Sequence, residues 1–198
     1  MDPIFQSIID TVVPFEDQLY GRRYRCALTL TDGTFLPCAV LQSRAKMVEL
    51  AKRRIAEEMS GDGIMACDDP YGEIVASFAT RRTQVCDYQV ASAAPSAFAI
   101  PLELLEQIEG ETFMGWTSWV FEMSDGRLFS YASSFDMEFF PLPQGYGFSD
   151  VRMVHSHSCL DASGALRRLM PGALAPDDFD PDAGFREKVF FTCFIDGI

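Results

Sequence analysis

Residues 24–41 read YRCALTLTDGTFLPCAVL, and this stretch decides the fold class. Two runs rich in apolar residues flank Asp32-Gly33, and both central residues of a two-residue hairpin turn need a positive φ. Asp-Gly between two such runs is the strongest short-range signal for a β-hairpin. The sequence therefore predicts an antiparallel hairpin with a two-residue turn at Asp32-Gly33.

A two-residue turn also fixes how the two strands pair. It pairs Leu30 with Phe35 and places Pro37 in a non-hydrogen-bonded pair. Because proline has no N–H to donate, the strand of residues 35–41 is predicted to lie at the edge of its sheet. An edge strand can pair with a second copy of the chain, so self-association through residues 35–41 is one hypothesis, and the expected state is a monomer or a homodimer.

A second hairpin is predicted over residues 116–134, where Ser-Asp-Gly-Arg occupies the centre. The same two-residue turn at Asp125-Gly126 places Trp119 opposite Ala132, so that a large side chain lies against a small one. Two hairpins of like design also raise the hypothesis of an internal duplication, on a shared motif that is short.

Residues 44–59 show the periodicity of an amphipathic helix. Ser43 is the predicted N-cap, and Gly61 is the predicted end. The apolar positions of the expected buried face are Val48, Ala51, Ile55 and Met59. Glutamates stand four residues from Arg53 and Arg54 of the basic run 52–54, which predicts a solvated, charge-paired face rather than a phosphate-binding patch.

Further segments complete the predicted fold. A short helix is expected after Pro101. Strands are expected at residues 73–78, which could also be helical, 84–91, 148–157 and 189–195. The last is apolar on both faces, which favours a central place in a sheet. The elements predict an α+β fold with a mainly antiparallel sheet, two Asp-Gly hairpins and one or two packed helices. Residues 1–198 are interpreted as a single α+β domain with a weak two-half organisation, 1–95 and 96–198.

Charge is the strongest global signal in the sequence. The 198 residues include 16 Lys and Arg against 29 Asp and Glu, which gives a formal net charge of −13. Residues 100–198 hold 6 of the basic and 16 of the acidic residues, so most of the surplus lies in the second half. Nucleic acids and anionic membranes are disfavoured as partners, because binding to either depends on basic side chains. A basic protein is the partner that this charge favours.

Composition also indicates a compartment. No window approaches the ~20 continuous apolar residues that a membrane-spanning helix needs, and the start of the chain has neither the basic nor the apolar region of a signal peptide. The six cysteines form no CxxC pair and show no regular spacing, which is typical of free thiols in a reducing compartment. We therefore expect a cytoplasmic protein.

Acidic and aromatic residues alternate between Glu103 and Asp150. This segment holds nine acidic residues, one basic residue and eleven aromatic residues, including both tryptophans. Aromatic anchors ringed by charge concentrate binding energy at protein interfaces, and the alternative is that the rings form the core. The candidate partner-binding residues are Trp116, Trp119, Glu122, Asp136, Glu138, Phe139, Phe140 and Tyr146. The predicted function is an acidic cytoplasmic binding protein that occludes or sequesters a basic protein partner, as an inhibitor or immunity-type protein does.

The only two histidines lie beside a cysteine in the run His-Ser-His-Ser-Cys. On a continued strand His155, His157 and Cys159 share one face, and imidazole and thiolate are both ligands for Zn²⁺. They are the candidate metal ligands, and a small metal- or thiol-dependent hydrolase is the alternative function. A polar strand end without a cofactor is the other interpretation. No phosphate loop, dinucleotide fingerprint, nucleophile elbow or HExxH motif is present, so binding is favoured over catalysis.

Overall fold

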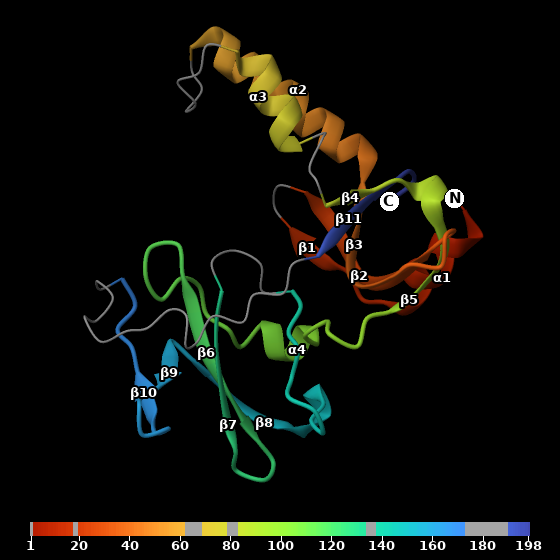
Figure 1. Ribbon diagram of the computed structural model, residues 1–198. Coiled ribbons are helices and arrows are strands. Elements are labelled where there is room, and N and C mark those ends of the chain that lie inside the picture. Colours follow the sequence, from red (N-terminus) through yellow and green to blue (C-terminus); the bar gives the residue numbers. More distant parts are fainter. Residues whose placement is uncertain (1, 18–19, 62–68, 79–82, 134–137, 173–189) are drawn as a thin grey trace. The chain divides into compact units, whose positions relative to one another are not determined.

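The computed structural model describes residues 2–17, 20–61, 69–78, 83–133, 138–172 and 190–198 (Figure 1). The chain forms two compact units, one of residues 1–97 with 190–198 and one of residues 98–189. We call them unit 1 and unit 2. Helices and mainly antiparallel strands occur together, which confirms the α+β class. The interpretation as a single domain with two halves stays a prediction.

Unit 1 contains a mixed sheet in the order β1-β2-β3-β11-β4, and β5 also pairs with β2. Its strands are β1 (Phe15–Asp17), β2 (Gly21–Leu30), β3 (Phe35–Ser43), β4 (Gln84–Val85), β5 (Val90–Pro95) and β11 (Phe191–Ile195). Strand β11 runs parallel to both β3 and β4 and lies between them. Strand β11 is therefore a central strand, as its two apolar faces predicted.

Helix α1 (Pro3–Thr11) packs on this sheet and was missed by the sequence analysis. Asp2 is its N-cap, and the side chain of Asp2 accepts a hydrogen bond from the N–H of Ile4. Phe5 and Ile8 are buried in the same cluster as apolar residues of β2 and β3. Asp-Pro before an apolar pair three residues apart is a recognisable helix start, so the signal was present.

Helix α2 (Arg44–Ser60) has the predicted ends. Ser43 caps its N-terminus, and Gly61 ends it with a φ of +81°. The predicted buried face is wrong, because the helix buries Met47 and Leu50 while Val48 is 48% exposed. The helix follows β3 without a linker, and α3 (Pro70–Phe78) packs against it. These two constraints decide which face is covered (Figure 1).

The segment of residues 73–78 is helical rather than a strand, since it belongs to α3. The strand expected at residues 84–91 is divided into β4, a 3-10 turn at Asp87–Gln89 and β5. No helix of the described ranges is long and apolar enough to cross a membrane.

The first hairpin forms, but its turn has three residues instead of two. The N–H of Leu30 donates to the carbonyl of Thr34, and Gly33 has a φ of +87°. The side chain of Asp32 accepts a hydrogen bond from the N–H of Thr34. This is a type I turn followed by a left-handed glycine. Next to the turn it shifts the pairing by one residue from the predicted register, which returns from Cys26 and Ala39 onward.

The prediction that residues 35–41 form an edge strand is also wrong. Strand β3 lies between β2 and β11, so it is not an edge strand, and self-association through residues 35–41 stays a prediction. Pairing with β11 begins only at Ala39, and the register with β2 shifts between the levels of Leu36 and Ala39. Pro37 therefore lies in an irregular stretch, where no ladder hydrogen bond is required of it.

Unit 2 contains a three-stranded antiparallel sheet in the order β7-β6-β8 and a separate pair, β9 with β10. Its elements are α4 (Leu102–Leu105), β6 (Thr117–Met123), β7 (Leu128–Ser133), a 3-10 turn (Phe148–Asp150), β8 (Val151–Ser156), β9 (Ser158–Leu160) and β10 (Leu166–Arg168). This sheet has no parallel pair among its described strands, unlike the sheet of unit 1. The two hairpins therefore belong to sheets of different topology, and the internal duplication stays a hypothesis.

The second hairpin has the same three-residue turn as the first. The N–H of Met123 donates to the carbonyl of Arg127, and Gly126 has a φ of +85°. The one-residue shift places Trp119 opposite Tyr131, not opposite Ala132 as predicted. Large rings therefore lie against large rings, and they form the centre of an aromatic core.

Candidate functional site

Several of the predicted partner-binding residues lie inside unit 2. Trp119, Phe139 and Phe140 are fully buried, and Glu138 is 5% exposed. The ring of Trp119 packs edge-on against Phe140 at a centroid distance of 4.8 Å. These three rings form part of the core, so a partner that docks on folded unit 2 does not contact them. Asp136 lies outside the described residues.

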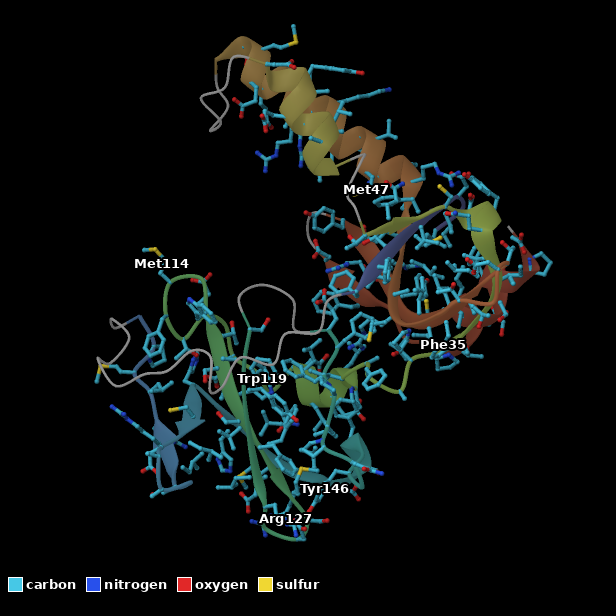
Figure 2. The ribbon with its side chains drawn as sticks, viewed as in Figure 1. Phe35, Met47, Met114, Trp119, Arg127 and Tyr146 are labelled. Atoms are coloured by element: carbon cyan, nitrogen blue, oxygen red, sulfur yellow. The ribbon has the colours of Figure 1, made fainter. Side chains whose placement is uncertain are left out.

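The other predicted partner-binding residues, Trp116, Glu122 and Tyr146, are only partly buried. Tyr146 lies beside the hairpin turn, where its hydroxyl donates to Asp125 at 2.7 Å and Arg127 lies over its ring at 5.7 Å (Figure 2). The hydrogen bond to Asp125 raises the pKa of Tyr146 and lowers the pKa of Asp125. Tyr146 thus stabilises the turn.

Glu122 connects two strands by its side chain. Its carboxylate contacts His155 Nε2 at 2.9 Å and also binds the guanidinium of Arg152. The hydrogen bond with His155, followed by the charge of Arg152, lowers the pKa of Glu122. Glu122 is therefore an anion that already has partners on β8, which makes it a poor first contact for a basic protein.

A hollow of about 400 Å³ opens in unit 2. It is lined by Gln107, Glu109, Met153, Val154, His155, Ser156, His157, Arg168, Leu169 and Pro171. These residues come from three segments, which lie before β6, along β8 and at the end of β10. Both histidines of the chain line this hollow.

His157 holds the three segments together. Its Nδ1 lies 3.0 Å from Thr112 Oγ1, and its Nε2 lies 3.5 Å from a carboxylate oxygen of Glu109. Its carbonyl accepts a hydrogen bond from the N–H of Leu169 at 2.7 Å. His157 has a φ of +48°, which only a few per cent of non-glycine residues adopt. These contacts hold the backbone in that conformation.

The positive φ of His157 also breaks the strand between β8 and β9, so the predicted period-two alternation does not continue to Cys159. His155 and His157 share the hollow, and Cys159 is not part of its lining. Within the described ranges, no three His, Cys, Asp or Glu side chains are grouped so that they could hold a metal ion. The zinc prediction therefore has no assembled ligand set there, and it stays a prediction.

An acidic band adjoins the hollow at Glu109, the one member of the band that lines it. It consists of Glu103, Glu106, Glu109 and Glu111, all of which are exposed. Leu105 and Ile108 of the same segment are buried, so the apolar side chains anchor the segment while the carboxylates face solvent. The sequence prediction centred on aromatic residues and therefore missed this band. The spacing of three residues between its first three glutamates was nevertheless visible in the sequence.

Apolar side chains complete the surroundings of the hollow. Met153 in its lining is 47% exposed, and Met170, between the lining residues Leu169 and Pro171, is 74% exposed. Methionine adapts its shape to different partners and is frequent on peptide-binding surfaces. The hollow thus offers adaptable apolar contacts and adjoins the acidic band at Glu109, while Arg168 is also in its lining.

Comparisons of the chain with protein-family models, with curated proteins and with solved structures gave no match. The functional argument therefore depends on the site itself.

Proposed function

We propose that the protein binds a basic protein partner through unit 2, and that it occludes or sequesters this partner as an inhibitor or immunity-type protein does. The acidic band beside the hollow is the observation that carries the proposal. Part of the proposal is that binding takes place in the cytoplasm, where the cysteines described as free thiols remain reduced.

The acidic band supplies the electrostatic part of recognition. Four exposed carboxylates within nine residues produce a local negative potential, and such a potential raises the association rate of a cationic partner. Exposed charges contribute little affinity by themselves, since water and salt screen them. The apolar lining of the hollow would contribute affinity by burying a side chain of the partner.

The geometry favours this function over the alternative hydrolase. His155 contacts a carboxylate and His157 contacts a threonine hydroxyl and a carboxylate, all within the fold. The one hydroxyl among these contacts belongs to Thr112, which is fully buried, so none of them offers an accessible nucleophile. A nucleophile needs a base such as an imidazole beside it.

The test uses two synthetic peptides of equal charge, one of lysine and leucine and one of lysine and serine. We expect the lysine-leucine peptide to bind with an association rate that falls as salt is added, and the lysine-serine peptide to bind more weakly. Substituting all four glutamates of the acidic band by glutamine should lower the association rate by about tenfold.

The matched control removes four exposed carboxylates from unit 1, with the substitutions Asp10→Asn, Glu16→Gln, Glu49→Gln and Glu73→Gln. Both variants change the formal net charge from −13 to −9, because each loses four of the 29 acidic groups. The control should lower the association rate by less than about twofold. Equal decreases in the two variants, or no binding of either peptide, would contradict the proposed function.

A further inference from the structure

Strand β8 is the last strand of its sheet. The order of the three described strands is β7-β6-β8, so only one side of β8 is paired with a strand. Among the described residues, no backbone-to-backbone hydrogen bond from another segment reaches Arg152 to Ser156 on the other side. The backbone N–H of Glu109 donates to the side-chain oxygen of Ser156 at 2.8 Å, which leaves the backbone groups of β8 unused. An open strand edge is a template for pairing with another extended chain.

The register shows which backbone groups point outward from this edge. Met123 is hydrogen-bonded across the hairpin to Arg127, so every second residue of β6 back from Met123 is bonded to β7. The residues between them, Val120 and Glu122, must then bond to β8, where they face His155 and Met153. The backbone N–H and C=O of Val154, the residue between those two, therefore point away from the sheet.

The next outward residue is Ser156. Its carbonyl accepts a hydrogen bond from the hydroxyl of Ser158 at 3.1 Å, whereas its N–H remains directed outward. The edge thus offers both backbone groups of Val154 and the N–H of Ser156. In strand addition, main-chain hydrogen bonds of this kind supply affinity for the added segment.

The hollow lies along this open edge. Four consecutive residues of β8, Met153 to Ser156, line it, although successive side chains of a strand point to opposite faces. Because all four residues line it, the hollow reaches the main chain of β8 as well as side chains. An added strand would therefore lie in the hollow, between β8 and the wall that Glu109 and Leu169 contribute.

We propose that the basic partner adds an extended segment to the edge of β8, with its cationic side chains toward Glu109 and its apolar side chains against Met153 and Leu169. This inference rests on the proposed function and specifies its binding mode. The carboxylate of Glu109 is 75% exposed, while Arg168 on the same wall limits how many cationic side chains fit. A second copy of the chain is a less favourable occupant, because two bodies of charge −13 repel each other.

Hydrogen exchange of the complex with the lysine-leucine peptide tests the predicted edge. The amides of Val154 and Ser156 should exchange at least about tenfold more slowly when the peptide is bound. The amides of Met153 and His155 are internal controls, since they are already bonded to β6 and should change little. Unchanged exchange at Val154 and Ser156 in a saturated complex would overturn strand addition.

A set of N-methylated peptides provides a second test that needs no variant of the protein. Methylation removes one backbone N–H at a time, and alternate residues of an added strand face β8. Affinity should fall by about fivefold or more at every second position and little at the positions between. A fall without this alternation indicates docking by side chains alone and overturns the inference.

The substitution Val154→Pro removes the outward N–H and leaves the hydrogen bonds between β6 and β8 intact. It should weaken peptide binding by about tenfold while the salt dependence of association is retained. If the glutamine variant of the acidic band slows association but neither the exchange pattern nor the alternation is seen, the proposed function stands and strand addition fails. If no peptide binds, both fail.

Self-pairing is a separate outcome of the same measurements. Protection of the Val154 and Ser156 amides that grows with protein concentration, without peptide, would show that a second copy occupies the edge. That result, together with a dimer in light scattering, would overturn the assignment of this edge to a basic partner.

Discussion

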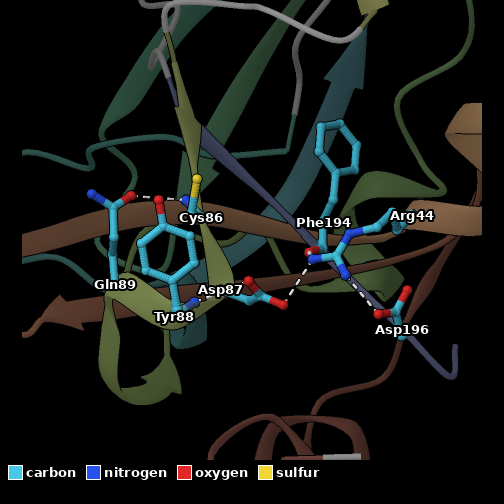
Figure 3. A network of polar contacts seen from close by, with 7 residues as sticks. All are labelled: Arg44, Cys86, Asp87, Tyr88, Gln89, Phe194 and Asp196. Atoms are coloured by element: carbon cyan, nitrogen blue, oxygen red, sulfur yellow. Dashed lines mark hydrogen bonds and ion pairs between the residues drawn. The ribbon is translucent and has the colours of Figure 1, made fainter.

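Arg44 binds Asp196 at 2.6 Å, although 152 positions of sequence separate them (Figure 3). The same guanidinium binds Asp87 at 2.7 Å and the carbonyl of Phe194 at 2.8 Å. Arg44 follows β3, Asp87 lies just beyond β4, and Asp196 follows β11. One side chain therefore joins the carboxyl ends of three parallel strands in unit 1.

We expect Arg44→Ala to destabilise the protein by about 1–2 kcal/mol, because three hydrogen bonds to the guanidinium are lost and solvent screens each ion pair. The matched control is Arg22→Ala, since Arg22 forms a single ion pair with Glu16 in which both side chains are more than 60% exposed. The control should cost less than about 0.5 kcal/mol. Urea unfolding measures both values, and equal costs would show that the additional contacts of Arg44 do not stabilise the protein.

The contribution of the Arg44 contacts to the free energy of unfolding should depend on pH. The hydrogen bond with Arg44 lowers the pKa of Asp87. A carboxyl group with a lowered pKa in the folded state stabilises the protein above its unfolded pKa of about 3.9, and this contribution disappears as the pH falls through the folded pKa.

The free energy of unfolding of the wild type should therefore exceed that of Arg44→Met by a constant amount between about pH 5 and 8. Below about pH 4 the difference should shrink, because Asp87 becomes protonated in both folded proteins. Urea unfolding at a series of pH values measures it. A difference that grows toward low pH is the result that this account does not allow.

The two tryptophans should differ sharply in their effect on stability. Trp119 is fully buried against Tyr131 and Phe140, so Trp119→Ala should cost about 3–5 kcal/mol. Trp116 is only partly buried, and Trp116→Ala should cost about half as much or less. Chemical unfolding followed by circular dichroism measures both variants. Similar costs would mean that the aromatic core extends to Trp116.

The sequence could predict the fold class because its main signals are local. Asp-Gly between apolar runs specifies a hairpin, and the cap at Ser43 and the glycine at 61 specify the ends of a helix. The apolar run at residues 189–195 indicates a central strand without any knowledge of its neighbours. Each of these features depends on residues within one element.

Features that depend on packing between elements were not predictable in the same way. A turn of two or three residues contains the same Asp-Gly, yet the choice decides whether Trp119 faces Ala132 or Tyr131. Helix α2 buries Met47 rather than Val48 because β3 and α3 fix its orientation. Neither constraint is encoded in the periodicity of the helix itself.

The candidate site was predicted only in part, because it too depends on packing between elements. The sequence singled out His155 and His157, and both line the hollow. It could not place Cys159, because the left-handed backbone of His157 ends the alternation that the pattern assumed. The glutamates of the acidic band were among the nine acidic residues of this segment, but they were not selected as candidates. No local feature of the sequence showed that the aromatic rings would be buried in the core and that these glutamates would be exposed.

The shared turn of the two hairpins yields a test in which glycine is replaced in both units. Gly33 and Gly126 have φ angles of +87° and +85°, and a Cβ at either would meet no atom within 4 Å. The cost of Gly33→Ala or Gly126→Ala is therefore backbone strain alone, which we expect to be about 1 kcal/mol at each site. We expect Gly33→Ala and Gly126→Ala to lower the free energy of unfolding by equal amounts, because the two turns have the same hydrogen bonds.

Gly110→Ala is the control for this pair. Gly110 has equal space for a Cβ, but its φ is not in the left-handed region. Alanine there should be neutral or should stabilise by up to about 1 kcal/mol, because it restricts only the unfolded chain. Urea unfolding of the three variants decides the matter. A neutral Gly126→Ala beside a destabilising Gly33→Ala would mean that the second hairpin adopts a different turn, and the register that points Val154 outward from β8 would then lose its basis.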